Sequence, residues 1–429
     1  MKRKLFFVLT FFPAIVFAQQ NPIAFKGALI YTATGVPIQN GVLVVQNGKI
    51  LSIGNASTTI PSNAEVIDMT GKVMMPGIVD THSHLGGPAG GDNSASLNPD
   101  TRALDAVNPT SDGFKKALSG GITTINLMPG SGFLMSGQTI YVKMRPAVTI
   151  EDLLITNEKG VYGGLKMANG TNPIKPLPNF SGNRSKSAAM DRDLFMKAVE
   201  YKKKITRAGK DSSKLPDRDL KMEPLVEVLD GKRIVHFHTH KANDILTALR
   251  ISKEFGFRVV LHHVTEGYKV AEQIAAAKVP CSIINVDAPG GKEEAINLWP
   301  GNGTTLEKAG VLTAIHTDDG ITDSRLLLRS AAMSIREGMS HDYAIKALTI
   351  NGARILDLDK QVGSLETGKD ADFIILSGDP FSVYTRVLQT WVEGMKRFDL
   401  SNPADKAFAV GGLGVYSPDR GELHQCIED

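Results

Sequence analysis

Both ends of the chain consist of short runs in which apolar and polar residues alternate. Near the amino terminus these runs are "FKGALIYTATG", "GVLVVQNGKILSIG" and "AEVIDMTGKVMMPG", and a similar pattern returns late in "GSLETGKDADFIILSGDP" and "VLQTWVEGMKRF". Alternation with a period of two, bounded by Gly, Asn, Asp and Pro, is typical of short antiparallel strands. We therefore expect the two ends to fold together as a small β-sandwich.

The part of the chain between the two ends has a different pattern. Eight short apolar runs occur there, and most are separated by stretches that can form helices, such as "ANDILTALRISKEFG". The runs cover residues 73–82, 122–128, 139–144, 164–167, 234–238, 258–263, 279–285 and 311–317. Eight strands that alternate with helices predict a (β/α)8 barrel. The polar stretch 169–218 is expected to be an excursion after the fourth strand, with one helix around residues 192–208.

These patterns divide the 429 residues of the chain into four parts. We predict a signal peptide at residues 1–18, the first part of a β-sandwich domain at 19–75, a distorted (β/α)8 TIM barrel at 76–357, and the second part of the sandwich at 358–429. A content of 42% hydrophobic residues is ordinary for a globular protein and is sufficient for a core of this size.

The opening stretch "MKRKLFFVLTFFPAIVFAQQ" has a basic start, an apolar stretch and a small residue at Ala18. This pattern is typical of a signal peptide cleaved after Ala18, and it predicts a periplasmic or secreted protein. Lys2, Arg3 and Lys4 account for the formal net charge of +3, so the cleaved chain would be neutral. A neutral chain gives no support for nucleic-acid binding, and no later segment is long and apolar enough to span a membrane.

The chain contains two cysteines, Cys281 and Cys426. Neither lies in a C-x-x-C or catalytic-cysteine pattern, so a thiol nucleophile is not expected. The two could pair in an oxidising compartment.

Histidines gather at four of the expected strand ends. Eight of the ten are found there: His82 and His84 after the first strand, His236, His238 and His240 at the fifth, His262 and His263 at the sixth, and His316 at the eighth, two residues before Asp318. Residues i and i+2 of a strand share a face, so His82 and His84 point the same way, and two imidazoles on one face suit a divalent metal. Catalytic groups of barrel enzymes lie at the carboxyl ends of several strands. The pattern therefore predicts a metal site at this end of the barrel.

Several of these features occur together in a known family. The segment "PGIVDTHSHLG", the spacing of the eight runs, "TDD" after the eighth run and the tail "NGARILDLDKQVGSLETGKDADFIILSGDPF" resemble the amidohydrolase superfamily, in particular its imidazolonepropionase-like and prolidase-like branch. The resemblance covers nearly all of residues 22–400. It implies a metal-dependent hydrolase with a distorted barrel and a small β-sandwich built from both termini.

The resemblance also implies a set of site residues. The metal ligands would be His82 and His84 of the first strand, His238 of the fifth, His263 of the sixth and Asp318 of the eighth, together with Lys166 in "GLKMANG". Lys166 matches a fourth-strand lysine that some members carboxylate to bridge two metal ions, whereas other members hold one ion and lack this lysine. A lysine reacts with carbon dioxide only as the neutral amine, which burial beside cations would favour. His240 and His316 are candidates to orient the ligands.

Two questions about the histidines stay open. His262 and His263 are adjacent in a strand, so they should face opposite ways and only one should enter the barrel. The family pattern favours His263. His236 is either a core residue or a group that orients a ligand.

The chemistry expected from this set is hydrolysis of an amide, a dipeptide or a cyclic amide. One or two divalent cations, with zinc favoured by the many imidazoles, would supply a metal-activated hydroxide, and Asp318 would act as general base. Arg184, Lys186 and Arg192 could bind the carboxylate of a dipeptide. The alternatives are a ring deaminase on the same metal site and a non-catalytic exported binding protein on this scaffold.

Overall fold

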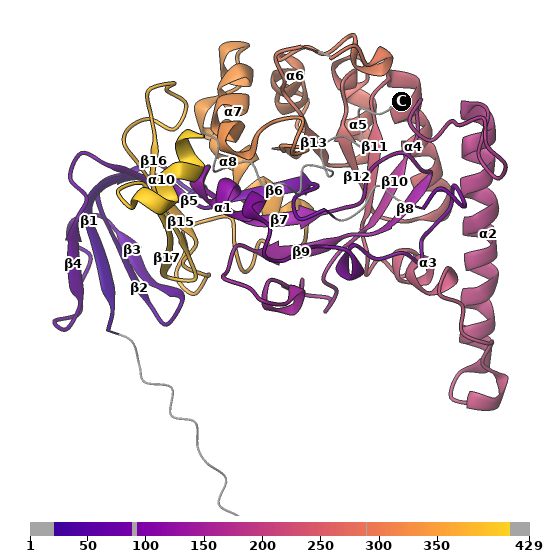
Figure 1. Cartoon of the computed structure of the whole chain (residues 1–429), viewed down its shortest axis with the longest axis horizontal. Helices are drawn as coiled ribbons and strands as arrows, with labels where there is room; N and C mark the ends of the chain where they lie inside the picture. The colour runs from indigo at the N-terminus through magenta and orange to yellow at the C-terminus, as the bar shows by residue number, and fades with distance from the viewer. Residues whose placement is uncertain (1–20, 88–91, 289, 412–429) are drawn as a thin grey trace, which may run out of the picture.

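The structure is a computed structural model that describes residues 21–87, 92–288 and 290–411 (Figure 1). The predicted signal peptide and Cys426 lie outside the described residues. Strands from the two ends of the chain gather on one side of the molecule, and the longest helix lies on the opposite side. Among the described residues, no helix combines the length and apolar character needed to cross a bilayer.

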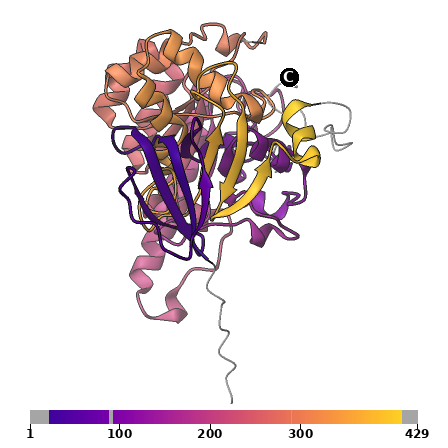
Figure 2. The same ribbon diagram turned by 90° about the vertical axis from the view of Figure 1, so that its left-hand side faces the viewer.

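The two chain ends share one eight-stranded sheet. Its strands are β1 (Ile23–Ile30), β2 (Ile38–Gln46), β3 (Lys49–Gly54), β4 (Glu65–Asp68), β5 (Val73–Pro76), β15 (Phe373–Leu376), β16 (Val387–Val392) and β17 (Met395–Asp399). They lie in the order β17-β16-β15-β5-β1-β2-β3, with β4 paired to β1. The antiparallel pair β5 and β15 joins the amino-terminal strands to the carboxyl-terminal ones, which lie side by side in Figure 2. Phe25, Phe373 and Trp391 pack edge-on and face-on in its core.

The central part of the chain forms two further sheets. One contains β6 (Ile78–Ser83), β7 (Ile122–Leu127) and β9 (Ile140–Lys143); the other contains β14 (Thr313–Ile315), β13 (Cys281–Ile283), β12 (Val259–His263), β11 (Val235–Thr239), β10 (Leu165–Ala168) and β8 (Met135–Gln138) in that order. A β-bridge between Ser83 and Asp319 connects the end of β6 to the segment after β14. This arrangement is a TIM-barrel-like α/β fold with mixed sheets.

Two of the expected strands differ from the prediction. The run 73–82 forms two strands, because β5 pairs in the end sheet and β6 in the central part. The chain passes between them at Gly77, where an added Cβ would lie 2.2 Å from Thr123 Oγ1. The run 139–144 gives β9, which is antiparallel to β7, while β8 is antiparallel to β10. A parallel crossover requires a long connection, usually a helix, and the segment before β9 instead contains β8.

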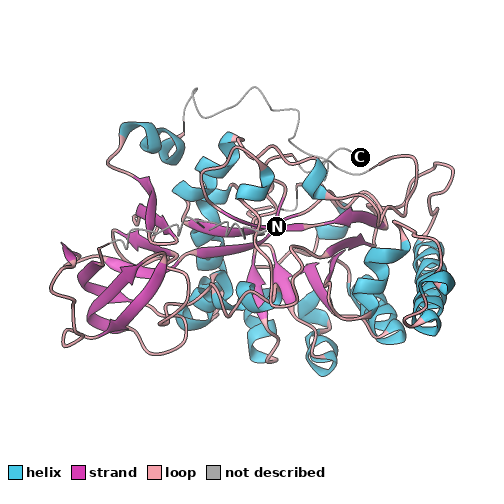
Figure 3. Cartoon of the chain, turned by 90° about the horizontal axis from the view of Figure 1, so that it is seen from below, coloured by secondary structure: helices cyan, strands magenta, loops and turns pink. Residues whose placement is uncertain are grey.

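Helices cover the strands of the central part, as Figure 3 shows. The α-helices are α1 (Asp112–Ser119), α2 (Arg184–Ala208), α3 (Met222–Leu229), α4 (Ala242–Phe255), α5 (Ala271–Ala277), α6 (Asn302–Lys308), α7 (Leu327–Arg336), α8 (His341–Leu348), α9 (Ile350–Ile355) and α10 (Pro403–Val410). The short 3₁₀ helices are η1 (Ala103–Asp105), η2 (Ile150–Asp152), η3 (Ser212–Lys214), η4 (Gly267–Lys269), η5 (Glu293–Ala295) and η6 (Ser324–Leu326).

The helix of the strand-four excursion is longer than expected. It begins at Arg184 and not near residue 192, because the side chain of Asn183 accepts a hydrogen bond from the Lys186 amide and so caps its first turn. Its apolar residues Leu194, Phe195 and Ala198 are buried. This helix, α2, stands against α4 at the outer edge of the fold.

A buried cluster of charges connects the end sheet to the central part. The Lys143 ammonium on β9 is 3.2 Å from the Asp372 carboxylate and also pairs with Asp370. On the same side, Arg145 pairs with Glu393 at 2.6 Å. Buried ion pairs of this kind fix the relative position of the elements that carry them, because breaking one leaves an uncompensated charge.

Candidate metal centre

The first group of candidate ligands lies where β6 and β14 end. His84 Nε2 is 2.9 Å from Asp318 Oδ1, and His82 Nε2 is 3.4 Å from the same oxygen. The Asp318 amide donates to the carbonyl of His82 at 2.9 Å, which holds the segment after β14 against β6. The ligand atoms of these three residues lie within 4.8 Å of one another. The three predicted residues therefore form one compact set of two imidazoles and a carboxylate.

Two further groups surround the first. His238, His240 and His263 form one, and His82, His263 and His316 form the other, again with ligand atoms within 4.8 Å. His263 belongs to both groups. His316 Nε2 lies 3.3 Å from His263 Nδ1, while its Nδ1 is 2.7 Å from Ser282 Oγ. The geometry thus places His240 and His316, expected only to orient ligands, in the candidate ligand sets themselves.

Lys166 lies at the centre of this cluster, on β10. Its side chain is fully buried, and Nζ is 3.1 Å from His82 Nε2 and 3.1 Å from Met128 Sδ. The predicted strand position is therefore correct, and the amine lies beside a candidate ligand. All six predicted ligands and both orienting candidates lie together.

The expectation that only one of His262 and His263 enters the barrel is wrong. His262 Nδ1 is 3.2 Å from His82 Nδ1, and the His263 ring lies 4.8 Å from the His82 ring. His262 pairs in register with His238 and shares its side of the sheet, whereas His263 reaches His82 because the strand does not continue regularly at its end. His263 and Val264 have φ values of 68° and 53°, so the backbone turns at the end of β12 and the alternation of sides is lost.

His262 and His236 form a chain of imidazoles behind His82. His236 Nδ1 is 3.0 Å from His262 Nε2, and His262 Nδ1 faces His82 Nδ1. If His82 keeps Nε2 free as a ligand, its Nδ1–H donates to His262, and His262 Nε2–H donates to His236. Gly164 makes room for the His236 ring, since an added Cβ would lie 2.3 Å from its Cδ2. His236 is thus a group that supports a ligand through His262.

Glu294 is a functional candidate that the sequence did not reveal. It is fully buried, and Oε1 lies 3.5 Å from His238 Nε2 and 3.9 Å from His240 Nε2. The Thr171 amide donates to its Oε2 at 2.9 Å, and the Lys292 ammonium is 3.3 Å from Oε1. Glu294 lies in the short 3₁₀ helix η5 after β13, where no motif distinguishes it from its neighbour Glu293.

Asp80 is a second buried acid that sequence reasoning did not single out, although it stands two residues before His82 in "VDTHSH". It accepts hydrogen bonds from the Thr317 amide and hydroxyl, at 3.1 and 2.5 Å. Burial raises the pKa of Asp80 to about 7, against the lowering effect of these hydrogen bonds. Asp80 ties β6 to the segment that carries Asp318.

Burial determines the protonation of the centre. Burial disfavours the charged imidazolium and so lowers the pKa of His82 well below its usual value, and the positive charge of Lys166 lowers it further. Burial also lowers the pKa of His236 to about 3. Burial alone would raise the pKa of Asp318, but the hydrogen bond and charge of His84 outweigh it and hold that pKa below its usual value. Neutral imidazoles and an ionised carboxylate are the forms that bind a metal cation.

The contacts of the centre fit a divalent cation. His84 Nδ1 is 2.7 Å from the carbonyl oxygen of Met128, so Nδ1 carries a proton; Nε2 faces the Asp318 carboxylate and meets it through a second proton or, once that proton is lost, through a bound cation. Two acceptors in contact need a cation between them or a proton. Within the described residues, the buried atoms His238 Nδ1 and His263 Nε2 have no hydrogen-bond partner. Buried ring nitrogens with unused lone pairs of this kind fit a bound divalent cation.

Other charged residues named from the sequence lie elsewhere. Asp319 pairs with Lys116 at 3.0 Å and accepts from the Ser324 amide at 2.9 Å, so it holds the loop after β14 in place. Arg184 and Arg192 pair with Asp244 and Glu254 on the outer helices, and both line a cavity between α2 and α4. They are therefore not at the metal centre.

Comparisons with known proteins agree with this geometry. The model described as "Amidohydrolase family" matches residues 303–403. A crystal structure of an amidohydrolase from Thermotoga maritima is 34% identical, with a TM-score of 0.82, over 88% of this chain and 100% of that one. The imidazolonepropionase of Picrophilus torridus is 24% identical over 395 residues, 85% of this chain and 94% of its own. Amidohydrolase tasK of Hapsidospora irregularis is 25% identical over 90% of this chain but 44% of its own length, so the chain spans less than half of that relative.

A TIM-barrel-like fold with clustered histidines and an aspartate at its strand ends defines the class of metal-dependent hydrolases. The chain belongs to the amidohydrolase family. It is an enzyme that acts on carbon–nitrogen bonds, and the family implies a divalent metal at a centre such as the one described.

Proposed function

We propose that this protein is an exported zinc enzyme that hydrolyses the carbon–nitrogen bond of a small amide, a dipeptide or a cyclic amide. The observation that carries the proposal is the contact of the buried Asp318 carboxylate with His84 and His82, at 2.9 and 3.4 Å. A carboxylate in this position can bind a cation and also accept a proton. His84 is the most open member of this group, with 17% of its side chain exposed, so a substrate would enter past it.

The proposed ligands follow from the contacts. His82, His84 and Asp318 would hold a first ion, and His238 and His263 would hold a second. Lys166 lies beside His82 and would bridge the two ions as a carboxylated lysine. Zinc is favoured over magnesium or calcium because most of these ligands are imidazoles.

The bound metal would lower the pKa of a water molecule and polarise the scissile carbonyl. The side chains of the protein would carry out the proton transfers. Asp318 is ionised, so its carboxylate takes a proton from the attacking water and delivers it to the leaving nitrogen. His84 holds Asp318 through Oδ1, while its own Nδ1 is fixed on the Met128 carbonyl.

We infer further that the two mixed central sheets close into a distorted (β/α)8 barrel over residues 76–357 and that residues 19–75 and 358–429 form a β-sandwich domain. Support comes from the bridge between Ser83 and Asp319 and from the pairing of β5 with β15. Export rests on the opening signal-peptide pattern alone, with a mature start at Gln19.

The test is a screen of the purified, zinc-loaded protein against dipeptides, N-acyl amino acids and cyclic amides, with new amine, new carboxylate and free ammonia measured separately. Release of amine and carboxylate supports the proposal. Ammonia release from a ring amine without a new carboxylate would identify a deaminase. No turnover of any class by the metal-loaded protein would support a binding role and overturn the proposal.

A further inference from the structure

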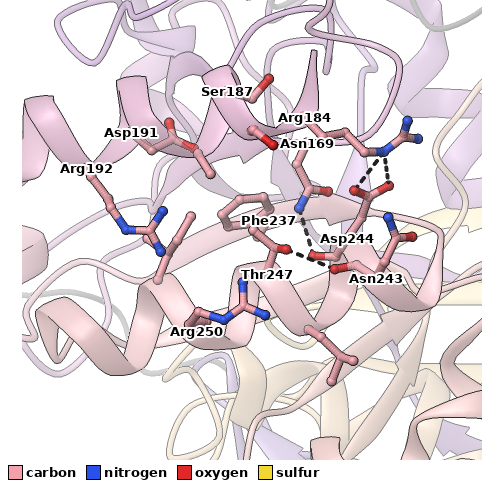
Figure 4. Close-up of a pocket in the computed structure, with 14 residues that line it drawn as sticks. Asn169, Arg184, Ser187, Asp191, Arg192, Phe237, Asn243, Asp244, Thr247 and Arg250 are labelled. Carbon is pink, nitrogen blue, oxygen red and sulfur yellow. Dashed lines mark hydrogen bonds and ion pairs between the residues drawn. The ribbon is translucent and has the colours of Figure 1, made fainter.

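A cavity separate from the metal centre lies between helices α2 and α4 (Figure 4). Its volume is about 450 Å³, within the range of roughly 300–1,000 Å³ that is usual for small-molecule sites. The helices supply polar residues on both sides, and the outward-facing Phe237 of β11 lies at its base. The metal-centre histidines His236 and His238 flank Phe237 in the strand and point to the other face.

The cavity contains a buried acid with no partner. Asp191 of α2 is 1% exposed, and its side chain makes no hydrogen bond or ion pair with any described residue. Burial raises the pKa of Asp191 well above its usual value, with only Arg192 acting in the opposite direction. A buried carboxyl group without a partner is costly, so this position needs a cationic or donating group from elsewhere.

A hydrogen-bond acceptor and a hydrogen-bond donor without partners also line this cavity. The buried oxygen Asn169 Oδ1 has no hydrogen-bond partner in the described part of the chain, and neither does Arg184 Nη2, although Arg184 Nε contacts both oxygens of Asp244. Arg250 of α4 points into the cavity from the side opposite α2 and pairs with no described acid. The cavity thus offers two acceptors and two guanidinium groups.

We propose that this cavity is a second binding site, and that it takes a free α-amino acid with an apolar side chain. The ammonium group of such a ligand would bind the Asp191 carboxylate and Asn169 Oδ1. Its carboxylate would bind the guanidinium groups of Arg250 and Arg184, which suit a planar anion. The apolar side chain would pack against Phe237, Leu246 and Ile251, which line the cavity.

The base of the cavity is joined to the metal centre by one short segment. The Asn169 amide donates to the His238 carbonyl at 3.1 Å, and Asn169 Nδ2 donates to the Asp244 carbonyl at 2.9 Å. Two residues further on, the Thr171 amide donates to Glu294. A ligand that binds Asn169 Oδ1 therefore contacts a residue whose amide is hydrogen-bonded to His238, a candidate metal ligand on β11. Through this contact the bound amino acid would regulate the enzyme.

The test is calorimetric titration of the zinc-loaded protein with L-leucine, beside N-acetyl-L-leucine, which lacks the ammonium group, and L-leucinamide, which lacks the carboxylate. We expect saturable binding of L-leucine and binding at least about tenfold weaker for each analogue, because each loses one charge-assisted contact. Arg250→Gln and Asp191→Asn should each weaken L-leucine binding by a similar factor. Lys253→Gln, on an exposed position of the same helix, is the matched control and should leave it unchanged.

Crystals soaked in L-leucine identify the site, with density expected between α2 and α4. Density only at the metal centre, or binding that Arg250→Gln and Asp191→Asn leave unchanged, would overturn the proposal. Equal binding of L-leucine and N-acetyl-L-leucine would overturn the amino-acid assignment in favour of a simple carboxylate. Arg250 is exposed, so its variant should fold normally even if Asp191→Asn does not. None of these readouts depends on catalysis, so they are independent of the proposed reaction.

Discussion

His262 Nδ1 lies 3.2 Å from His82 Nδ1, so the imidazole of one strand end supports the candidate metal ligand of another. This contact fixes the ring of His82 and leaves Nε2 directed at Lys166 and Asp318. A partner on the second ring nitrogen is the usual way in which a metal-binding histidine is oriented.

The first prediction concerns this contact. His262→Phe keeps the size and packing of the ring but removes the partner of His82 Nδ1. Zinc affinity should fall by about 10–100-fold, measured by competition with a chromogenic chelator. His341→Phe is the control, because His341 packs on Tyr31 and Phe381 and pairs with Asp379. Unchanged zinc affinity in His262→Phe would show that His262 does not orient a ligand.

The second prediction compares two neighbouring aspartates. Asp318→Asn keeps the size and one oxygen ligand but removes the base, so turnover should fall by about 10²–10⁴-fold on the substrate that the screen identifies, with most of the metal retained. Asp319→Asn should keep the wild-type turnover but unfold at a lower denaturant concentration. It weakens the ion pair with Lys116, at a cost of roughly 1–3 kcal/mol. Full activity in both variants would mean that neither aspartate is the base.

The third prediction tests Glu294. Glu294→Gln removes the negative charge beside His238 and His240 and leaves Lys292 without its buried partner. Zinc affinity should fall by roughly 10-fold or more, measured by metal analysis after dialysis at graded chelator concentrations. The matched control is Glu293→Gln, since the Glu293 side chain is 77% exposed and its ion pair among the described residues is with Lys241. If the two variants retain zinc equally, Glu294 does not act on the centre.

The fourth prediction concerns Lys166. If it bridges two ions as a carboxylated lysine, elemental analysis should find about two metal ions per chain, and Lys166→Met should reduce this to about one. Anomalous diffraction would show the bridge directly. A single ion in the wild-type protein, unchanged in the variant, would identify a mononuclear centre.

The fifth prediction follows from the buried acid in the outer cavity. Because burial raises the pKa of Asp191, the folded protein binds this proton more tightly than the unfolded chain does. The wild-type protein therefore loses stability as the pH rises from the usual aspartate range through the raised pKa. Arg184, Arg192, Arg250 and Asp244 are the other charged groups that line the cavity.

Asp191→Asn lacks this proton, so its stability relative to the wild type should increase with pH. A gain of roughly 0.5–2 kcal/mol is expected near pH 8 and almost none near pH 4, from denaturant midpoints at matched zinc concentration. An equal difference between the two proteins at both pH values would show that Asp191 titrates normally.

Much of the fold and of the site follows from local patterns. The alternation of apolar residues predicts the strands, because each strand must bury one or both faces. The spacing of His82 and His84 predicts that they share a direction, since side chains alternate along a strand. The positions of His238, His263 and Asp318 at run ends then predict one site, because parallel strands end at the same side of a barrel.

Only the tertiary structure decided which further groups join that site. His263 reaches His82 beside His262 because the backbone leaves the strand conformation at His263, and a turn of this kind has no periodic signal. Glu294 reaches His238 from η5, whose position depends on contacts with distant segments such as the hydrogen bond from the Thr171 amide. The antiparallel β8 and β9 and the cavity between α2 and α4 depend likewise on how distant segments pack. Local periodicity reports which face of an element is buried, whereas loop paths and contacts between elements are set by the free energy of the whole chain.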